Sequence, residues 1–376
     1  MKIVVDDKIP YIKGVFEGKA EVEYIPGTLI DSRHLKDADA LIVRTRTKCN
    51  RELLEGSKVR FIATATIGFD HIDTEYCRSA GIEWTNAPGC NAESVNQYMA
   101  SALTHWAGEK NILLKEKTIG IVGVGNVGSK VARTAQILGM KVLLNDPPRA
   151  RKEGPAEFVD LRNILAEADI ISLHVPLNLE GLDKTWHMVN KCFLELWENP
   201  GLIINTCRGE VMDTHDIMTR IEKGKLEDYI IDCWEDEPDI SLNLLEESFI
   251  GTPHIAGYSR DGKANGTAQC VQAVSRFFKL GMDSFYPDVI EAPFFPNIIL
   301  DGSGKGEEEI LSTAIQSTYD IKQDDRALRE NPRDFEKLRG DYPVRREFHA
   351  FNITCSNVDQ GTIKSIRELG FTINDE

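Results

Sequence analysis

The sequence predicts an α/β protein built on doubly wound parallel sheets. Two observations support this fold class. Short apolar runs with the character of strands alternate with helix-like segments along most of the 376 residues, which is the order that parallel sheets require. One strand–turn–helix–strand segment, residues 118–146, also carries glycines and an acidic residue at the spacing of a nucleotide-binding unit.

This segment opens with an apolar, β-branched run, Ile119–Val124, as expected for a buried parallel strand. Gly123, Gly125 and Gly128 follow G-x-G-x-x-G spacing. The first glycine permits a tight turn, the second lets a pyrophosphate approach the backbone, and the third lets helix and strand pack closely. Asp146 stands at the end of the next strand, residues 141–145, where a carboxylate can accept hydrogen bonds from a ribose diol and would repel a 2′-phosphate. The segment therefore predicts a Rossmann-type domain that binds NAD.

In about the first hundred residues, short predicted strands alternate with short predicted helices or turns. The expected strands cover residues 2–5, 40–43, 61–65 and 82–85, and the helices or turns between them cover 34–38, 51–56 and 73–80. A long helix is expected over residues 92–110, with Val95, Met99 and Trp106 on its apolar face. We expect residues 1–97 to form a flavodoxin-like domain, completed by the segment 258–286.

The same alternation continues beyond the glycine segment. We expect residues 98–257 to form the nucleotide domain, with further strands at 169–173, 202–206 and 229–233 and helices at 161–166 and 215–222. A helix over 265–280 and a linker over 287–296 follow. The prediction for residues 290–376 is a separate α/β module, with strands at 298–300, 350–354 and 371–373 and helices at 307–320 and 360–369.

Composition restricts the class of function. The chain has 44 Lys and Arg against 60 Asp and Glu, a net charge of −16, so it lacks the excess of positive charge that nucleic-acid binding needs. No apolar run reaches the roughly 18 residues of a membrane span, and the N-terminus has the pattern of a first strand rather than a signal peptide. The eight cysteines lack C-x-x-C pairs and close histidine partners, so we expect reduced thiols, no metal site and a cytoplasmic location.

Three ionisable residues in the second half, Arg208, Glu237 and His254, lie just beyond predicted strands. Ligands of doubly wound sheets bind at the carboxyl ends of the strands, where the nicotinamide is expected. A histidine can take the hydroxyl proton of an alcohol as hydride leaves, and a carboxylate can fix the imidazole and stabilise its charged form. An arginine can hold a substrate carboxylate through two hydrogen bonds. Each residue type alone is more often a surface residue, but together they predict oxidation of a 2-hydroxy acid.

A basic loop follows the strand at 40–43. Arg44, Arg46 and Lys48 alternate with the hydroxyls of Thr45 and Thr47, which is a suitable donor set for a phosphate in an otherwise acidic protein. A solvated basic loop is the less favoured alternative for the same residues.

Several segments resemble signatures of the D-isomer-specific 2-hydroxyacid dehydrogenases. They are Asn-Thr-Cys-Arg-Gly at 205–209, Asp-Cys-Trp-Glu-Asp-Glu-Pro at 232–238 and Thr-Pro-His-Ile-Ala-Gly at 252–257. Residues 87–92, 146–149 and 254–267 resemble more narrowly those family members that oxidise 4-phospho-D-erythronate in pyridoxal phosphate biosynthesis. This resemblance covers nearly the whole chain, including a C-terminal module that such enzymes use to form homodimers.

The resemblance implies a role for each matched residue. His254 would be the acid/base, Glu237 its partner and Arg208 the anchor of the substrate carboxylate. Besides the glycines, the implied NAD contacts are Asn126, Val127, Asp146, Val175, Thr206, Cys207, Arg208, Asp232 and Gly257. The implied substrate contacts are Thr45, Thr66 and Tyr258, beside the basic loop residues Arg44 and Arg46.

The expected reaction is oxidation of 4-phospho-D-erythronate to 3-hydroxy-2-oxo-4-phosphooxybutanoate by NAD. Two alternatives stay open. The substrate could be 3-phosphoglycerate or another D-2-hydroxy acid. The chain could also be an NAD-sensing binding protein, similar to a transcriptional corepressor, because such proteins can retain the catalytic residues of this scaffold.

Overall fold

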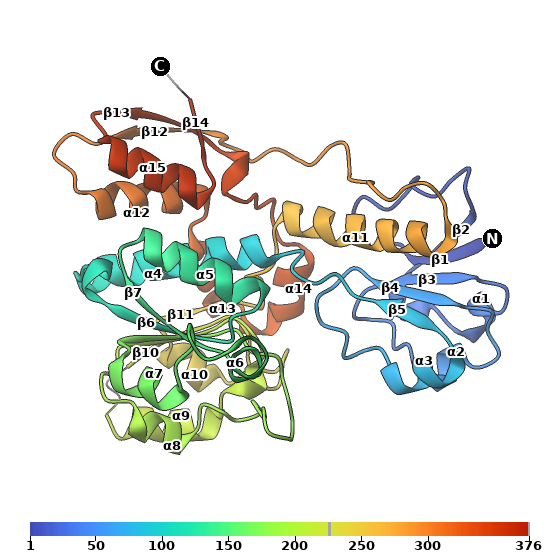
Figure 1. The fold of residues 1–376 in the computed structure, drawn as a ribbon, viewed down its shortest axis with the longest axis horizontal. Coiled ribbons are helices and arrows are strands. Elements are labelled where there is room, and N and C mark those ends of the chain that lie inside the picture. The colour runs from blue at the N-terminus through green and yellow to red at the C-terminus, as the bar shows by residue number, and fades with distance from the viewer. Residues whose placement is uncertain (225–226, 375–376) are drawn as a thin grey trace. The chain divides into compact units, whose positions relative to one another are not determined.

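The computed structural model describes residues 1–224 and 227–374, and these form two compact units (Figure 1). The first unit combines Met1–Asn91 with Ser259–Glu291, and the second combines Ala92–Tyr258 with Ala292–Glu376. Each strand pairing in the described residues is parallel. The predicted α/β class with parallel sheets is therefore confirmed.

The first unit is built on a five-stranded sheet in the order β2-β1-β3-β4-β5, the order of flavodoxin-like folds. The strands are β1 Lys2–Asp6, β2 Glu21–Ile25, β3 Ala40–Val43, β4 Phe61–Thr64 and β5 Glu83–Thr85. Helices α1 Ser32–Leu35, α2 Arg51–Leu54 and α3 Thr74–Ala80 pack on one face of this sheet, and α11 Arg260–Phe278 packs on the other. The sheet is therefore buried on both faces.

Strand β2 was not predicted from the sequence. This strand lies at the edge of the sheet and alternates glutamates with apolar residues, and its fourth residue, Tyr24, is only partly buried. An edge strand needs one apolar face at most, so its sequence is close to that of a polar loop.

The second unit contains a six-stranded sheet in the order β11-β10-β9-β8-β6-β7. The strands are β6 Thr118–Val122, β7 Lys141–Asn145, β8 Ile170–Leu173, β9 Leu202–Asn205, β10 Asp228–Ile231 and β11 Ile250–Gly251. The chain passes from β6 to β7 on one side and then returns to β8 on the other, so the strand order reverses at β6. Such a switch point is where doubly wound sheets bind ligands, beyond the carboxyl ends of the strands.

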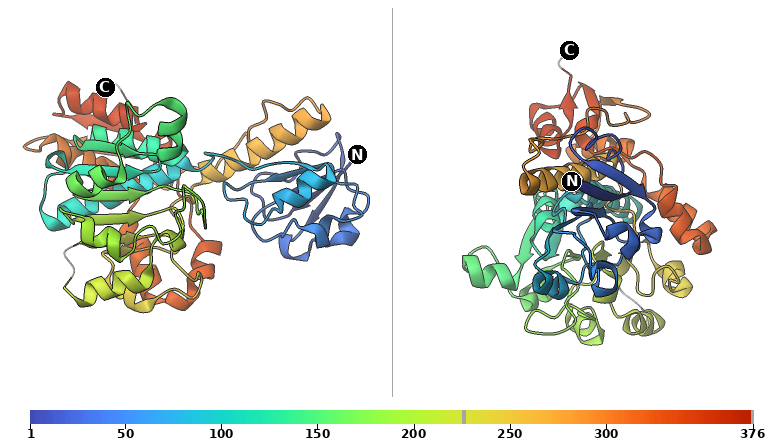
Figure 2. Two further views of the ribbon diagram at one scale, coloured as in Figure 1. Left: turned by 60° about the horizontal axis from the view of Figure 1, so that its bottom comes forward. Right: turned by 90° about the vertical axis from the view of Figure 1, so that its right-hand side faces the viewer.

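Helices cover both faces of this sheet, as Figures 1 and 2 show. Helices α4 Ala92–Lys110 and α5 Asn126–Ile137 share one apolar core with the sheet. A second core on the opposite face contains residues of α7 Leu161–Glu167, α8 Lys191–Leu196, α9 Thr214–Glu222 and α10 Leu242–Glu247. Alternate strand residues point into the two cores, for example Ile203 into the second and Ile204 into the first.

The C-terminal segment adds a three-stranded sheet, ordered β12-β13-β14, to the second unit. Its strands are β12 Asn297–Asp301, β13 Asn352–Ser356 and β14 Thr372–Ile373, and its helices are α12 Glu307–Thr318, α13 Ile321–Glu330, α14 Phe335–Gly340 and α15 Gln360–Leu369. Helices α13 and α14 were not predicted because their charged residues outnumber their apolar ones. Helix α12 contributes Ile310, Leu311, Ala314 and Ile315 to the core that contains α4.

Polar contacts also join the C-terminal segment to α4. The side chain of Ser94 donates to Glu347 at 2.9 Å, that of Gln97 to the carbonyl oxygen of Arg346 at 2.9 Å, and that of Ser101 to the carbonyl oxygen of Tyr319 at 2.8 Å. These three side chains of α4 are buried. The polar face of α4, which its sequence would assign to solvent, is therefore covered by the C-terminal segment.

Candidate active site

The glycine turn after β6 fits a dinucleotide. Gly123 has a φ of 90°, and a Cβ atom there would lie 2.6 Å from the carbonyl oxygen of His174. A Cβ at Gly128 would lie 2.0 Å from the carbonyl oxygen of Gly123, whereas one at Gly125 would meet no atom within 4 Å. Gly125 is also the N-cap of α5 and supplies no side chain to the first turn of that helix. The first N–H groups of α5 are thus available for a pyrophosphate, as in other nucleotide-binding helices.

Asp146 is fixed against this turn. Its Oδ2 accepts a hydrogen bond from the backbone N–H of Val124 at 2.9 Å, and its Oδ1 accepts one from the backbone N–H of Arg149 at 3.0 Å. The second bond caps helix α6, Pro147–Glu153. Each carboxylate oxygen has a second lone pair, so Asp146 can also accept a bond from a ribose hydroxyl.

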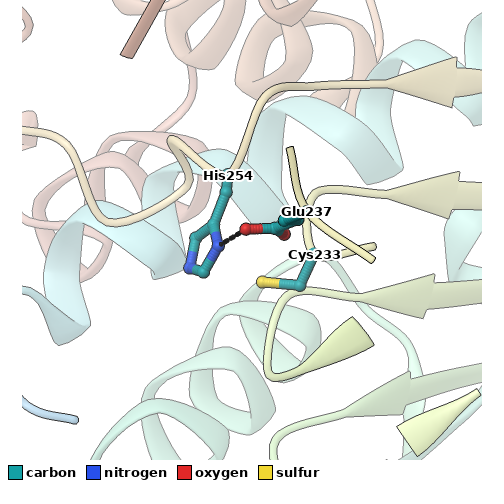
Figure 3. Close-up of side chains that lie close together, drawn as sticks. All are labelled: Cys233, Glu237 and His254. Atoms are coloured by element: carbon teal, nitrogen blue, oxygen red, sulfur yellow. Dashed lines mark hydrogen bonds and ion pairs between the residues drawn. The ribbon is translucent and has the colours of Figure 1, made fainter. Parts of the chain in front are cut away.

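His254 and Glu237 form a hydrogen-bonded pair (Figure 3). His254 Nδ1 lies 2.7 Å from Glu237 Oε2, and Glu237 Oε1 accepts a bond from the backbone N–H of Trp234 at 2.9 Å. The side chains of His254 and Glu237 are 32% and 20% exposed. Because the carboxylate fixes Nδ1 as the donor, Nε2 is the nitrogen that can accept a proton, and it points away from Glu237.

Charges around the pair keep Glu237 ionised. Burial alone would raise the pKa of Glu237, but the hydrogen bond and charge of His254, the N–H of Trp234 and the charge of Arg339 outweigh burial and lower the pKa. Arg339 belongs to α14, and its guanidinium carbon lies 5.8 Å from the centre of the Tyr258 ring. The C-terminal segment therefore adds a positive charge near the pair.

A buried carboxylate, Asp232, holds the loop that carries His254. Asp232 is 1% exposed. Its oxygens accept hydrogen bonds from Thr252 Oγ1 at 2.7 Å and from the backbone N–H groups of Ile255 at 2.8 Å and Ala256 at 3.0 Å. The hydroxyl of Tyr98 on α4 lies 2.8 Å from the same Thr252 oxygen. The loop is thus bonded on both sides of His254, which itself has a left-handed backbone with φ of 54°.

The loop that carries Arg208 lies against the loop that carries Glu237. Asn205 Nδ2 donates to the carbonyl oxygens of Arg208 at 2.9 Å and Cys233 at 3.2 Å. A Cβ atom at Gly209 would lie 1.9 Å from the carbonyl carbon of Trp234. Only glycine permits this approach of the two backbones.

Glu237 and His254 lie close to Cys233, and the charge of Arg208 also acts on this residue. Burial raises the pKa of the Cys233 thiol well above its usual value, Asp232 and Glu237 raise it further, and Arg208 opposes them. The sulfur, a carboxylate oxygen of Glu237 and a ring nitrogen of His254 lie within 4.8 Å of one another. The second unit thus brings Glu237 and His254 together, and the charge of Arg208, whose Nη1 donates to the carbonyl oxygen of Cys207 at 2.8 Å, acts on the same thiol.

The remaining predicted cofactor residues also belong to the second unit. Thr206 Oγ1 lies 3.4 Å from His174 Nδ1, and Cys207 is buried, with its N–H donating to Asn205 Oδ1 at 3.1 Å. Val175 lies two residues beyond β8, and Gly257 follows the loop that Asp232 holds. These positions surround the carboxyl ends of β8, β9 and β10.

The predicted phosphate loop lies in the first unit. Arg44 pairs with the buried Asp6 at 3.5 Å, while Thr45 and Lys48 line an open pocket of about 460 Å³. Thr66, on the next loop, hydrogen bonds through its hydroxyl to Thr64 at 2.7 Å and to the carbonyl oxygen of Gly68 at 2.9 Å. The prediction of a further phosphate hydroxyl at Thr47 is wrong, because Thr47 is 3% exposed and donates to the carbonyl oxygen of Gly27.

Comparisons with known proteins decide the family. Residues 92–256 match the NAD-binding domain of D-isomer-specific 2-hydroxyacid dehydrogenases, and residues 289–370 match a domain of unknown function. The chain is 53% identical to erythronate-4-phosphate dehydrogenase of Bacteroides thetaiotaomicron, over 94% of this chain and 99% of that protein. The chain belongs to the erythronate-4-phosphate dehydrogenase family. The predicted family membership and the NAD-binding domain are therefore confirmed.

Solved structures of dehydrogenases have a similar fold. A D-lactate dehydrogenase of Aquifex aeolicus, complexed with NAD and lactic acid, has a TM-score of 0.62 and 28% identity, covering 75% of this chain and 96% of that one. An NAD-bound 3-phosphoglycerate dehydrogenase of Entamoeba histolytica has a TM-score of 0.62 and 26% identity, covering 77% of this chain and 99% of that one. Each of these structures therefore matches more of the chain than residues 92–256, the part that matches the NAD-binding domain.

Three polar residues of the site were not predicted from the sequence: His174, Arg339 and Arg345. His174 directly follows β8, so the rule that selected Arg208 could have selected it. Arg339 and Arg345 belong to the C-terminal segment, far along the chain from the strand ends. Arg339 acts on Glu237 through its charge, and Arg345 donates to the carbonyl oxygen of Ala256 in the His254 loop. No local pattern in the sequence indicates either contact.

Proposed function

We propose that this chain oxidises 4-phospho-D-erythronate at C2, with NAD, to 3-hydroxy-2-oxo-4-phosphooxybutanoate. The main structural support for the proposal is the 2.7 Å hydrogen bond between His254 and Glu237. This bond places the ring proton on Nδ1 and leaves Nε2 free to accept a proton. The 53% identity to a protein named erythronate-4-phosphate dehydrogenase supports the choice of substrate. In this proposal the protein works in the cytoplasm in pyridoxal phosphate biosynthesis. Among the described residues, no helix is long and apolar enough to cross a membrane.

In the proposed reaction His254 Nε2 takes the proton of the C2 hydroxyl as the C2–H bond breaks and the C2=O bond forms. NAD, when bound, accepts the hydride. Glu237 stabilises the resulting imidazolium and keeps the ring oriented. Arg208 holds the C1 carboxylate through two hydrogen bonds and polarises the developing carbonyl.

We further propose that Arg44, Thr45, Arg46 and Thr66 bind the substrate phosphate and that Tyr258 contacts the substrate. The loop of the first unit supports this role, because its basic and hydroxyl side chains suit a phosphate dianion. For NAD, the donor set would be the glycine turn, Asn126, Val127, Asp146, Val175, residues 206–208, Asp232 and Gly257.

Substrate choice is testable with a panel. Formation of NADH should be fastest with 4-phospho-D-erythronate and slower with 3-phospho-D-glycerate, D-erythronate and D-glycerate. A higher kcat/KM for 3-phospho-D-glycerate than for 4-phospho-D-erythronate would show that 3-phospho-D-glycerate is the better substrate and would contradict the proposal. The weaker similarity to 3-phosphoglycerate dehydrogenase, 26% identity, makes this alternative the second choice.

The panel also separates an enzyme from an NAD sensor. A sensor would bind NAD but leave it oxidised with each hydroxy acid of the panel. The basic loop at Arg44–Lys48 favours the enzyme, because a protein that responds only to NAD needs no second anion site.

We propose that two copies associate through the C-terminal segment. Phe294, Phe295 and Ile299 are 88%, 72% and 82% exposed. Helices α12 and α15 cover one face of the β12–β14 sheet (Figure 1), and Ile299 of β12 points to the opposite face. Exposed apolar side chains of this size favour a protein partner. Sedimentation of the parent chain as a dimer, and of Ile299→Asp as a monomer, would support this interface. A monomeric parent chain would exclude it.

A further inference from the structure

Cys233 is a buried thiol that the proposed reaction does not use. It lies two residues beyond β10 and is 2% exposed. Its sulfur points toward the His254–Glu237 pair (Figure 3), and the three donor atoms lie within 4.8 Å of one another. In the described part of the chain, no other three His, Cys, Asp or Glu side chains bring their donor atoms so close together.

These three donors match the preferences of zinc. Zn²⁺ binds thiolate sulfur at about 2.3 Å and imidazole nitrogen or carboxylate oxygen at about 2.0–2.2 Å, in tetrahedral geometry. Donors on such an ion lie roughly 3.3–3.6 Å apart. The sulfur would therefore have to approach the pair by about 1 Å, and His254 Nδ1 and Glu237 Oε2, which are 2.7 Å apart, would have to separate slightly. His254 and Glu237 are 32% and 20% exposed, which gives an ion access from solvent.

We propose that Zn²⁺, and other divalent cations that prefer sulfur, bind to Cys233, Glu237 and His254 and block the catalytic pair. Binding displaces the thiol proton and the proton that Nδ1 shares with Glu237, and forms one bond each to sulfur, nitrogen and oxygen. No electron is transferred, and water completes the coordination. The carboxylate can then no longer stabilise an imidazolium, so His254 stops acting as a base. The inhibitory part rests on the proposed function, whereas metal binding does not.

The sulfur makes the site selective. Without Cys233 the donors would be one imidazole and one carboxylate, which bind divalent ions weakly. A thiolate favours zinc and cadmium, whereas magnesium and calcium prefer oxygen donors. Inhibition by micromolar Zn²⁺ or Cd²⁺ without inhibition by millimolar Mg²⁺ or Ca²⁺ is therefore expected.

Cobalt spectroscopy tests binding without an assay of activity. Co²⁺ should give the parent chain a near-ultraviolet band of thiolate-to-cobalt charge transfer. Cys233→Val, which keeps an apolar side chain at a buried position, should lack the band. Cys192→Ser is the matched control, because Cys192 is the exposed cysteine, and this variant should keep the band. Absence of the band in the parent chain, or its presence in Cys233→Val, would overturn the proposed site.

Inhibition is the second test. Cys233→Val should need at least about 10-fold more Zn²⁺ for half-inhibition, and Cys192→Ser should need the parent concentration. Equal sensitivity of Cys233→Val and the parent, or relief of inhibition by Cys192→Ser, would exclude the mechanism. If the parent chain oxidises no hydroxy acid, the proposed function fails, and the cobalt band still decides the metal site.

Discussion

Arg345 donates a hydrogen bond through Nη2 to the carbonyl oxygen of Ala256, two residues beyond His254. Arg345 is 5% exposed, and its guanidinium carbon lies 4.5 Å from the centre of the Tyr319 ring. Asp232 binds the N–H of the same Ala256 at 3.0 Å. The loop beyond His254 is thus held by an aspartate after β10 and an arginine of the C-terminal segment.

We predict that Arg345→Met lowers the free energy of unfolding by about 2–4 kcal/mol, because it removes buried hydrogen bonds of a charged group. The loop should also lose its alignment, so kcat should fall more than KM rises. Urea denaturation and steady-state kinetics measure the two effects. Arg345→Lys, which keeps the charge, should recover part of kcat. Unchanged kcat in Arg345→Met would mean that the C-terminal segment does not position His254.

His254→Ala should lower kcat by at least about 100-fold, because a positioned general base contributes roughly this much. NAD affinity, measured by calorimetry, should change little, because the glycine turn and Asp146 are untouched. If the variant kept the kcat of the parent, His254 could not be the general base.

Gly209→Ala should unfold at markedly lower urea concentration and lose most activity. Its new methyl group would lie 1.9 Å from the carbonyl carbon of Trp234, so the loops of Arg208 and Glu237 would have to separate. Gly108→Ala is the control. Gly108 lies in helix α4, where an added methyl group would meet no atom within 4 Å, so alanine there should stabilise the protein by up to about 1 kcal/mol. Similar stability of the two variants would contradict the close approach of the loops.

His174 should make folding sensitive to acid. Burial lowers the pKa of its imidazole to about 3, while in the unfolded chain the pKa is about 6.5. Between these two values the unfolded state binds more protons, so folding stability falls as the pH decreases through this range. Above pH ~6.5 both states are neutral and the effect vanishes.

His174→Gln isolates this contribution. Between pH 7 and 5 the variant should lose about 1–2 kcal/mol less unfolding free energy than the parent. Urea denaturation at several pH values measures the difference. Parallel pH dependence of the two proteins would show that His174 does not titrate in this way.

Much of the second unit could be predicted from sequence because its signals are local. Strand β7 and helices α4 and α15 have the predicted limits. Strand β7 is an apolar run between polar residues, and α15 has a strong apolar periodicity. The catalytic candidates were found because each follows a strand closely, and parallel strands gather such positions at one edge. The support of His254 could not be found in this way. Asp232 directly follows β10 and was predicted as a cofactor contact, but its bonds to the His254 loop were not. Arg345 also acts through distant backbone, and no sequence spacing encodes such contacts.

Buried serine, glutamine and threonine side chains of α4 face the C-terminal segment. A chain shortened near residue 290 would leave the apolar residues around α4 in water and remove the arginine that bonds the histidine loop. The residues beyond that point therefore cannot be treated as a detachable appendage. A relative without these residues would need different side chains on α4, with polar residues in place of the apolar ones that the C-terminal segment now covers.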